Sequence, residues 1–194
     1  MDFLIERTAS EADDYPVYTL LDAQGASLLR AERGQGALPE ERRQMRLTRP
    51  GGRLVATIDL SQVESPAMAE EKRTDYAIIH EFAVYAIVSV CRRPDADDNG
   101  ASGVYFVLEV EGETWLALPH PEEAGCFALY DEVPAGLHTY DTLTELDLPA
   151  SIGRICQQNE GSRLTIRLAP RRLKRTDMVL LALGYLIDQS ATSP

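Results

Sequence analysis

The stretch RTDMVLLALGYLIDQS (Arg175–Ser190) contains ten consecutive apolar residues, Met178 to Ile187, in a chain that is otherwise acidic and polar. As a helix, ten residues are about 15 Å long, whereas the hydrocarbon layer of a membrane is about 30 Å thick. Asp177 precedes the run and Asp188 follows it. The run is therefore too short to cross a membrane, and we expect no transmembrane segment here.

The same run shows no polar face at helical spacing. Successive helix positions turn by about 100°, so ten of them point in every direction around the axis. A helix that is apolar on all sides belongs inside a protein core. Thr176 could serve as its N-cap, and Asp177 suits the positive end of the helix dipole. Gly184 would allow a neighbouring backbone to approach closely.

Most of the remaining chain alternates between apolar and polar residues, which is typical of half-buried β-strands. RQMRLT (43–48) and RLVATID (53–59) flank the turn Pro50-Gly51-Gly52, a pattern that predicts a β-hairpin. GVYFVLEV (103–110) with ETWLALP (113–119), and SRLTIRL (162–168), indicate further strands. Tyr76–Cys91 favours strand, broken near His80-Glu81, whereas residues 65–75 suggest an exposed connection.

Many short strands and one wholly apolar helix favour a closed antiparallel β-barrel around the helix, because an open sheet would leave half of the helix in water. We therefore expect a mainly β fold, formed by one domain over residues 1–194. A barrel filled by its own helix should have no interior pocket, so binding is expected in outer grooves and loops.

The net charge, the cysteines and the N-terminal sequence restrict the partners and the cellular location that we expect. The net charge is −12, which disfavours a nucleic-acid partner and a broad electrostatic contact with anionic membranes. The three cysteines, Cys91, Cys126 and Cys156, are widely spaced and suggest no disulfide framework. The N-terminus MDFLIERTASEADD does not resemble a signal peptide. These features predict a cytoplasmic protein.

The segment IGRICQQ … SRLTIRLAPRRLKRTDMVLLALGYLID resembles the C-terminal third of the phospholipid scramblase and LURP-one-related branch of the tubby-like superfamily. The matching positions are Ile152–Ile155, Leu164–Leu168 and Met178–Asp188. The resemblance implies a barrel of about twelve antiparallel strands around a C-terminal helix. The cysteine-rich palmitoylation segment, the acidic calcium segment and the Pro-rich N-terminal arm of scramblases are absent here. The resemblance therefore implies the fold, and the lipid activities do not carry over.

Two segments carry candidate ligand-binding residues. Asp95, Asp97 and Asn99 in RPDADDNGASG match the first half of a calcium-binding loop, and Gly100 supplies its turn. Position 12 of such a loop would be Phe106 instead of a glutamate, so we favour a solvated hairpin tip over a metal site. Calcium is the one cofactor that the sequence suggests.

The second segment is a basic cluster of Arg171, Arg172, Lys174 and Arg175, which could contact a phosphate or an anionic lipid head group. We favour the simpler interpretation, a solvated link into the last helix.

No P-loop, GxGxxG, GxSxG or HExxH motif is present, and the three histidines lack metal-ligand spacing. We therefore predict a non-catalytic binding or scaffolding domain whose ligand is a protein or a lipid head group. The alternative is a peripheral lipid-binding or scramblase-like protein at the inner membrane face, responsive to calcium. A third hypothesis is an enzyme with an unrecognised loop site.

Overall fold

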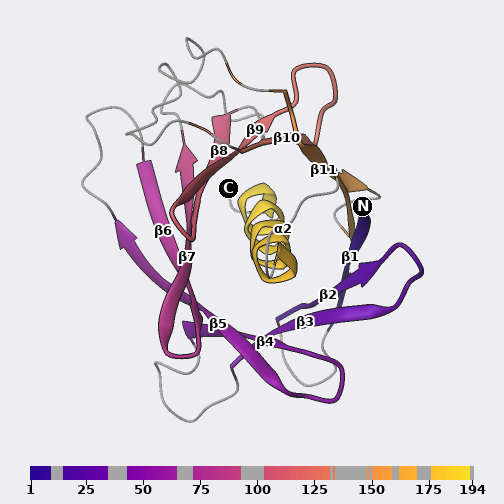
Figure 1. Ribbon diagram of the computed structural model, residues 1–194, viewed down its shortest axis with the longest axis vertical. Coiled ribbons are helices and arrows are strands. Elements are labelled where there is room, and N and C mark those ends of the chain that lie inside the picture. The colour runs from indigo at the N-terminus through magenta and orange to yellow at the C-terminus, as the bar shows by residue number, and fades with distance from the viewer. Residues whose placement is uncertain are drawn as a thin grey trace.

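The computed structural model describes residues 1–9, 15–34, 43–64, 72–92, 103–131, 133, 148, 150–158, 162–169 and 176–192. Within these residues, twelve antiparallel strands form a closed barrel, and the helix α2 (Thr176–Thr192) runs through its centre (Figure 1). The predicted mainly β architecture with a buried C-terminal helix is confirmed.

The strands follow one another around the barrel in chain order, and β1 closes it by pairing with β12. Their bounds are β1 (Asp2–Thr8), β2 (Val17–Asp22), β3 (Ser27–Arg33), β4 (Gln44–Thr48), β5 (Leu54–Glu64), β6 (Lys72–His80), β7 (Ala83–Arg92), β8 (Val104–Val110), β9 (Glu113–Pro119), β10 (Cys126–Tyr130), β11 (Gly153–Gln158) and β12 (Arg163–Leu168). Closure removes the exposed strand edges that an open sheet would have.

The predicted hairpins form with the expected register. Met45 and Leu47 of β4 face Ile58 and Ala56 of β5, and all four side chains point into the core. The strand break near His80 is also confirmed, because β6 ends there. The Nδ1–H of His80 donates a hydrogen bond of 2.7 Å to the carbonyl of Val55.

The helix is buried on all sides, as its composition requires. Leu180, Leu183 and Leu186 are each at most 3% exposed. Burial of a leucine side chain contributes about 1.5–3 kcal/mol, so this helix supplies much of the driving force for folding. Gly184 lies against Ile5 of β1, and a Cβ atom at position 184 would overlap the Ile5 side chain. The close approach expected at Gly184 is therefore made by a side chain of the barrel wall.

The expectation that the cysteines form no disulfide is wrong. Cys126 of β10 and Cys156 of β11 are bonded to each other, whereas Cys91 is a buried cysteine outside the disulfide. The two cysteines are 30 residues apart in the sequence, and they become neighbours only when β10 pairs with β11, so their spacing alone did not predict the bond.

In the part of the chain that the structure describes, no helix combines the length and apolar character needed to cross a membrane.

Candidate functional site

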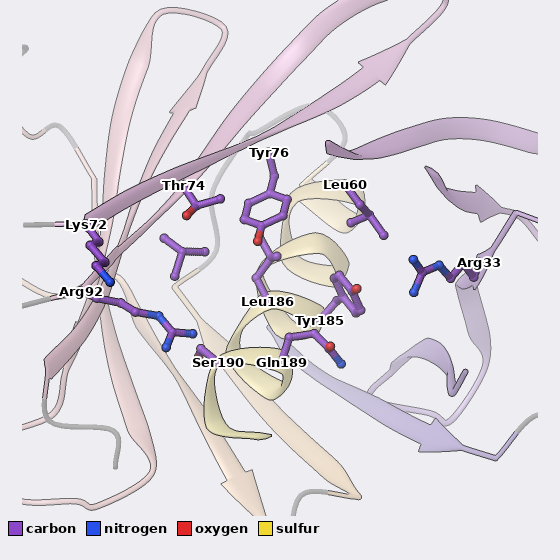
Figure 2. A pocket seen from close by; sticks show the side chains of 11 residues that line it. Arg33, Leu60, Lys72, Thr74, Tyr76, Arg92, Tyr185, Leu186, Gln189 and Ser190 are labelled. Atoms are coloured by element: carbon purple, nitrogen blue, oxygen red, sulfur yellow. The ribbon is translucent and has the colours of Figure 1, made fainter. Parts of the chain in front are cut away.

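The helix does not fill the barrel to its end. At the mouth near its C-terminal turns lies a cavity of about 490 Å³ (Figure 2). Its wall is formed by Arg33, Leu60, Lys72, Thr74, Tyr76, Val90, Arg92, Tyr185, Leu186, Gln189 and Ser190. The expectation that a filled barrel has no interior pocket is therefore wrong.

Strand alternation explains why these side chains point inward. Thr74 and Tyr76 lie on the same face of β6 as Ile78, which is fully buried. Val90 and Arg92 lie on the same face of β7 as Val88, which is also fully buried. Successive side chains of a strand point to opposite faces. The inward faces therefore change from aliphatic in the barrel centre to polar and cationic at this mouth.

The helix supplies the opposite wall of the cavity. The hydroxyl of Ser190 donates to the carbonyl of Ile187 at 2.8 Å, and Gln189 Nε2 donates to the Tyr18 hydroxyl at 3.3 Å. The Tyr185 ring packs edge-on against the Tyr18 ring, with centroids 5.3 Å apart. Burial raises the pKa of Tyr185, and nearby Arg33 offsets part of that increase. Tyr185 therefore keeps its proton and can donate a hydrogen bond to a ligand.

The cavity is positively charged although the protein is strongly acidic. Arg33, Lys72 and Arg92 contribute three cationic side chains, and none of its described lining residues is an Asp or a Glu. The chain as a whole has a net charge of −12. Figure 2 shows Lys72 and Arg92 on one side of the helix end and Arg33 on the other. Arg33 also lies 4.0 Å above the centroid of the Tyr15 ring.

Lys72 and Arg92 are direct cross-strand partners in the β6–β7 pair. Like charges in that arrangement repel each other and destabilise a sheet. Within the described part of the chain, no carboxylate lies within ion-pair distance of either side chain. The mouth of the barrel thus holds two adjacent cationic side chains whose repulsion a bound anion would offset.

A second cross-strand cation pair on the outer face shows how the chain neutralises such a pair elsewhere. Arg154 of β11 faces Arg167 of β12. Arg154 Nη1 lies 2.7 Å from Glu123 Oε1, and Arg167 Nε lies 4.0 Å from Asp2 Oδ1. Each of these arginines therefore has its own carboxylate, in contrast to Lys72 and Arg92.

Both the calcium-like loop (Asp95, Asp97, Asn99) and the basic cluster (Arg171, Arg172, Lys174, Arg175) lie outside the described residues.

The cavity residues were missed for an identifiable reason. Residues 65–75 were assigned to an exposed connection, but β6 begins at Lys72, so that assignment is wrong for residues 72–75. Extending the alternation of Tyr76 and Ile78 back to Thr74 and Lys72 would have placed Lys72 on the inward face.

Comparison of this chain with family models, with curated proteins and with solved structures found no match.

Proposed function

We propose that this protein is a non-catalytic binding domain whose cavity at the barrel mouth takes a phosphate-bearing ligand. The observation that carries the proposal is the cross-strand pair of Lys72 and Arg92, which has no carboxylate partner among the described residues. A phosphate is a multivalent anion with several acceptor oxygens, so one group can satisfy both cations. Charge-assisted hydrogen bonds of this kind are among the strongest in proteins.

The remaining lining indicates what the phosphate is attached to. Leu60, Val90 and Leu186 form an apolar surface beside the cations, and Tyr76 and Tyr185 add aromatic rings. The volume of about 490 Å³ falls within the roughly 300–1,000 Å³ that is common for small-molecule sites. A ligand with its phosphate at the mouth and a compact apolar or hydroxylated part against the tyrosines matches this surface.

The chemistry of the lining favours binding over catalysis. Its described residues include no Asp, Glu, His or Cys, which are the usual general bases and nucleophiles. The raised pKa of Tyr185 keeps its hydroxyl protonated at neutral pH. The available groups can hold an anion and donate hydrogen bonds to it, and no carboxylate or imidazole among the described lining residues stands beside Lys72, Thr74 or Ser190 to activate it.

We also propose that the chain belongs to the scramblase-related branch of the tubby-like superfamily. A twelve-stranded barrel around a C-terminal helix is compatible with the tubby-like fold, and the segments at Ile152–Ile155, Leu164–Leu168 and Met178–Asp188 resemble its scramblase-related branch. Tubby proteins bind phosphoinositides, so a lipid head group is one source of the phosphate. In that case the protein acts at the cytoplasmic face of a membrane, as a peripheral protein.

Calorimetry with the full chain tests the proposal, using inorganic pyrophosphate and phenyl phosphate as probes and phenol as the uncharged comparison. We expect binding of the two anions and none of phenol. Lys72→Gln combined with Arg92→Gln should weaken binding at least about 100-fold, since each of the two charged hydrogen bonds contributes about 1.5–3 kcal/mol. Arg167→Gln, which removes one cation of the outer pair, is the matched control and should bind like the unmodified protein.

Vesicle flotation separates the two sources of phosphate. Binding to phosphatidylcholine vesicles that contain a phosphoinositide, lost in the Lys72/Arg92 variant, would assign the ligand as a lipid head group. Binding of the soluble anions without flotation would assign a free phosphorylated metabolite. Absence of both would show that another part of the chain neutralises the two cations, and would overturn the proposal.

A further inference from the structure

A second site lies on the outer face of the barrel, where Cys126 and Cys156 oppose each other across β10 and β11. The neighbouring pair, Gly125 and Gln157, is joined by a backbone hydrogen bond of 2.9 Å. Cys126 and Cys156 therefore occupy a narrow, non-hydrogen-bonded position, in which side chains are closest. Their Cα atoms are 4.1 Å apart.

Glu123 completes a group of three potential metal ligands. The Cys126 amide donates to the Glu123 carbonyl at 3.1 Å, and this turn directs the Glu123 carboxylate back over the sulfur atoms. Glu123 Oε2 lies 3.4 Å from Cys126 Sγ and 3.9 Å from Cys156 Sγ. The three ligand atoms all lie within 4.8 Å of one another.

The two sulfur–oxygen separations are compatible with a tetrahedral zinc centre, which forms only after the bonded sulfur atoms are reduced and move apart. With zinc–sulfur bonds of about 2.3 Å and zinc–oxygen bonds of about 2.1 Å, tetrahedral ligands place sulfur and oxygen about 3.6 Å apart. The two observed sulfur–oxygen distances, 3.4 and 3.9 Å, lie on either side of that value. A hollow of about 470 Å³ borders the cysteines, so a fourth position can be taken by water.

Arg154 supports the same assignment. Its Nη1 donates to both oxygens of Glu123, at 2.7 and 2.9 Å, and holds the carboxylate over the cysteines. Hydrogen bonds that orient a ligand are a regular feature of metal sites. Two thiolates, one carboxylate, one divalent cation and the Arg154 guanidinium together carry no net charge, so the centre is electrostatically balanced.

We propose that reduced Cys126 and Cys156, together with Glu123, bind Zn²⁺, and that the disulfide and the zinc complex are alternative states of one site. A dithiol reductant opens the disulfide by thiol–disulfide exchange. It becomes a disulfide itself and transfers two electrons and two protons to the two sulfur atoms. Zinc binding then releases both thiol protons, because thiolates are the ligands. Cys156 is half-buried and faces the hollow, which gives a reductant access.

Cobalt titration of the full chain tests this proposal, because Co²⁺ bound to thiolates absorbs light. The protein is reduced with a dithiol, which is then removed without oxygen. We expect one Co²⁺ per chain with thiolate-to-cobalt absorption, displacement by Zn²⁺, and no band before reduction. Zinc should also slow re-formation of the disulfide.

Variants assign the ligands. Cys126→Ser and Cys156→Ser should each remove the band. Glu123→Gln replaces a carboxylate ligand with a neutral amide and should weaken Co²⁺ binding by at least the roughly 10- to 100-fold that follows loss of a residue that only orients a ligand. Cys91→Ala, which changes the cysteine outside the disulfide, should leave binding unchanged. Glu123 lies in an exposed turn, so its variant tests the site even if a cysteine variant folds poorly. Absence of the band in the reduced protein, or Co²⁺ binding unaffected by Glu123→Gln, would overturn the proposal. The outcome of the cobalt experiment does not depend on whether the barrel mouth binds phosphate.

Discussion

The Tyr18 hydroxyl donates a 2.6 Å hydrogen bond to the carboxylate of Asp188, which is fully buried. Arg7 Nη1 lies 3.6 Å from the same carboxylate oxygen. Strands β1 and β2 thereby hold the last turns of α2 at a fixed depth in the barrel. Because Gln189, the next residue, lines the cavity, the anchor at Asp188 also positions part of the cavity wall.

Loss of this hydrogen bond should destabilise the protein. Tyr18→Phe removes the hydroxyl but keeps the ring, and it leaves a buried carboxylate with one donor fewer. We expect the free energy of unfolding to fall by about 1–3 kcal/mol. Denaturant unfolding measures the change, and Tyr15→Phe, at an exposed ring, should shift it by less than about 0.5 kcal/mol. Equal effects of the two substitutions would contradict the anchoring role.

The same pair predicts how stability depends on alkaline pH. Burial, and then the hydrogen bond to Asp188, raise the pKa of Tyr18 above its ordinary value of 10.0. The folded protein therefore keeps a proton that the unfolded chain loses above about pH 10. This contribution to stability is complete below pH 10 and is lost as the pH rises toward the folded-state pKa.

Denaturant unfolding measured at several pH values above 10 tests whether stability falls as the pH rises. The decline in stability should be less steep in Tyr18→Phe than in the unmodified protein, because one of the raised tyrosines is gone. Tyr185, whose pKa is also raised by burial, should account for part of the remaining slope. Parallel curves for the two proteins would show that Tyr18 titrates normally and contradict the prediction.

Gly184 should be intolerant of a methyl group although it lies in a helix. Alanine normally stabilises a helix by about 1 kcal/mol relative to glycine, but here its Cβ would overlap Ile5 Cδ1. Overpacking costs about 1–3 kcal/mol, so Gly184→Ala should lower stability. Ile5→Val removes the Cδ1 atom and should rescue Gly184→Ala in a double-mutant cycle. A Gly184→Ala protein about 1 kcal/mol more stable than the unmodified one, as helix propensity alone predicts, would contradict the contact.

The apolar run and the strand alternation in the sequence were sufficient to predict the barrel around a helix, but not to predict the disulfide or the buried carboxylate of Asp188. Residues Met178 to Ile187 are apolar in every helical direction, and burial of such a helix requires a surrounding wall. Alternation of apolar and polar residues, as at Met45 and Leu47, predicted the strands that form this wall. The Cys126–Cys156 bond depends on which strands become neighbours and in what register, information that is spread over 30 residues. Asp188 marked the end of the apolar run in the sequence, yet only the placement of Tyr18 shows why it is buried.

The central claim is that Lys72 and Arg92 repel each other until an anion joins them, and a double-mutant cycle tests it most directly. The free energy of unfolding is measured for the unmodified protein, Lys72→Gln, Arg92→Gln and the double variant, first without phosphate and then with saturating pyrophosphate. We expect an unfavourable coupling of about 0.2–1 kcal/mol without the anion, and a favourable coupling when it is present. A coupling that is zero, or that keeps the same sign under both conditions, would contradict the account.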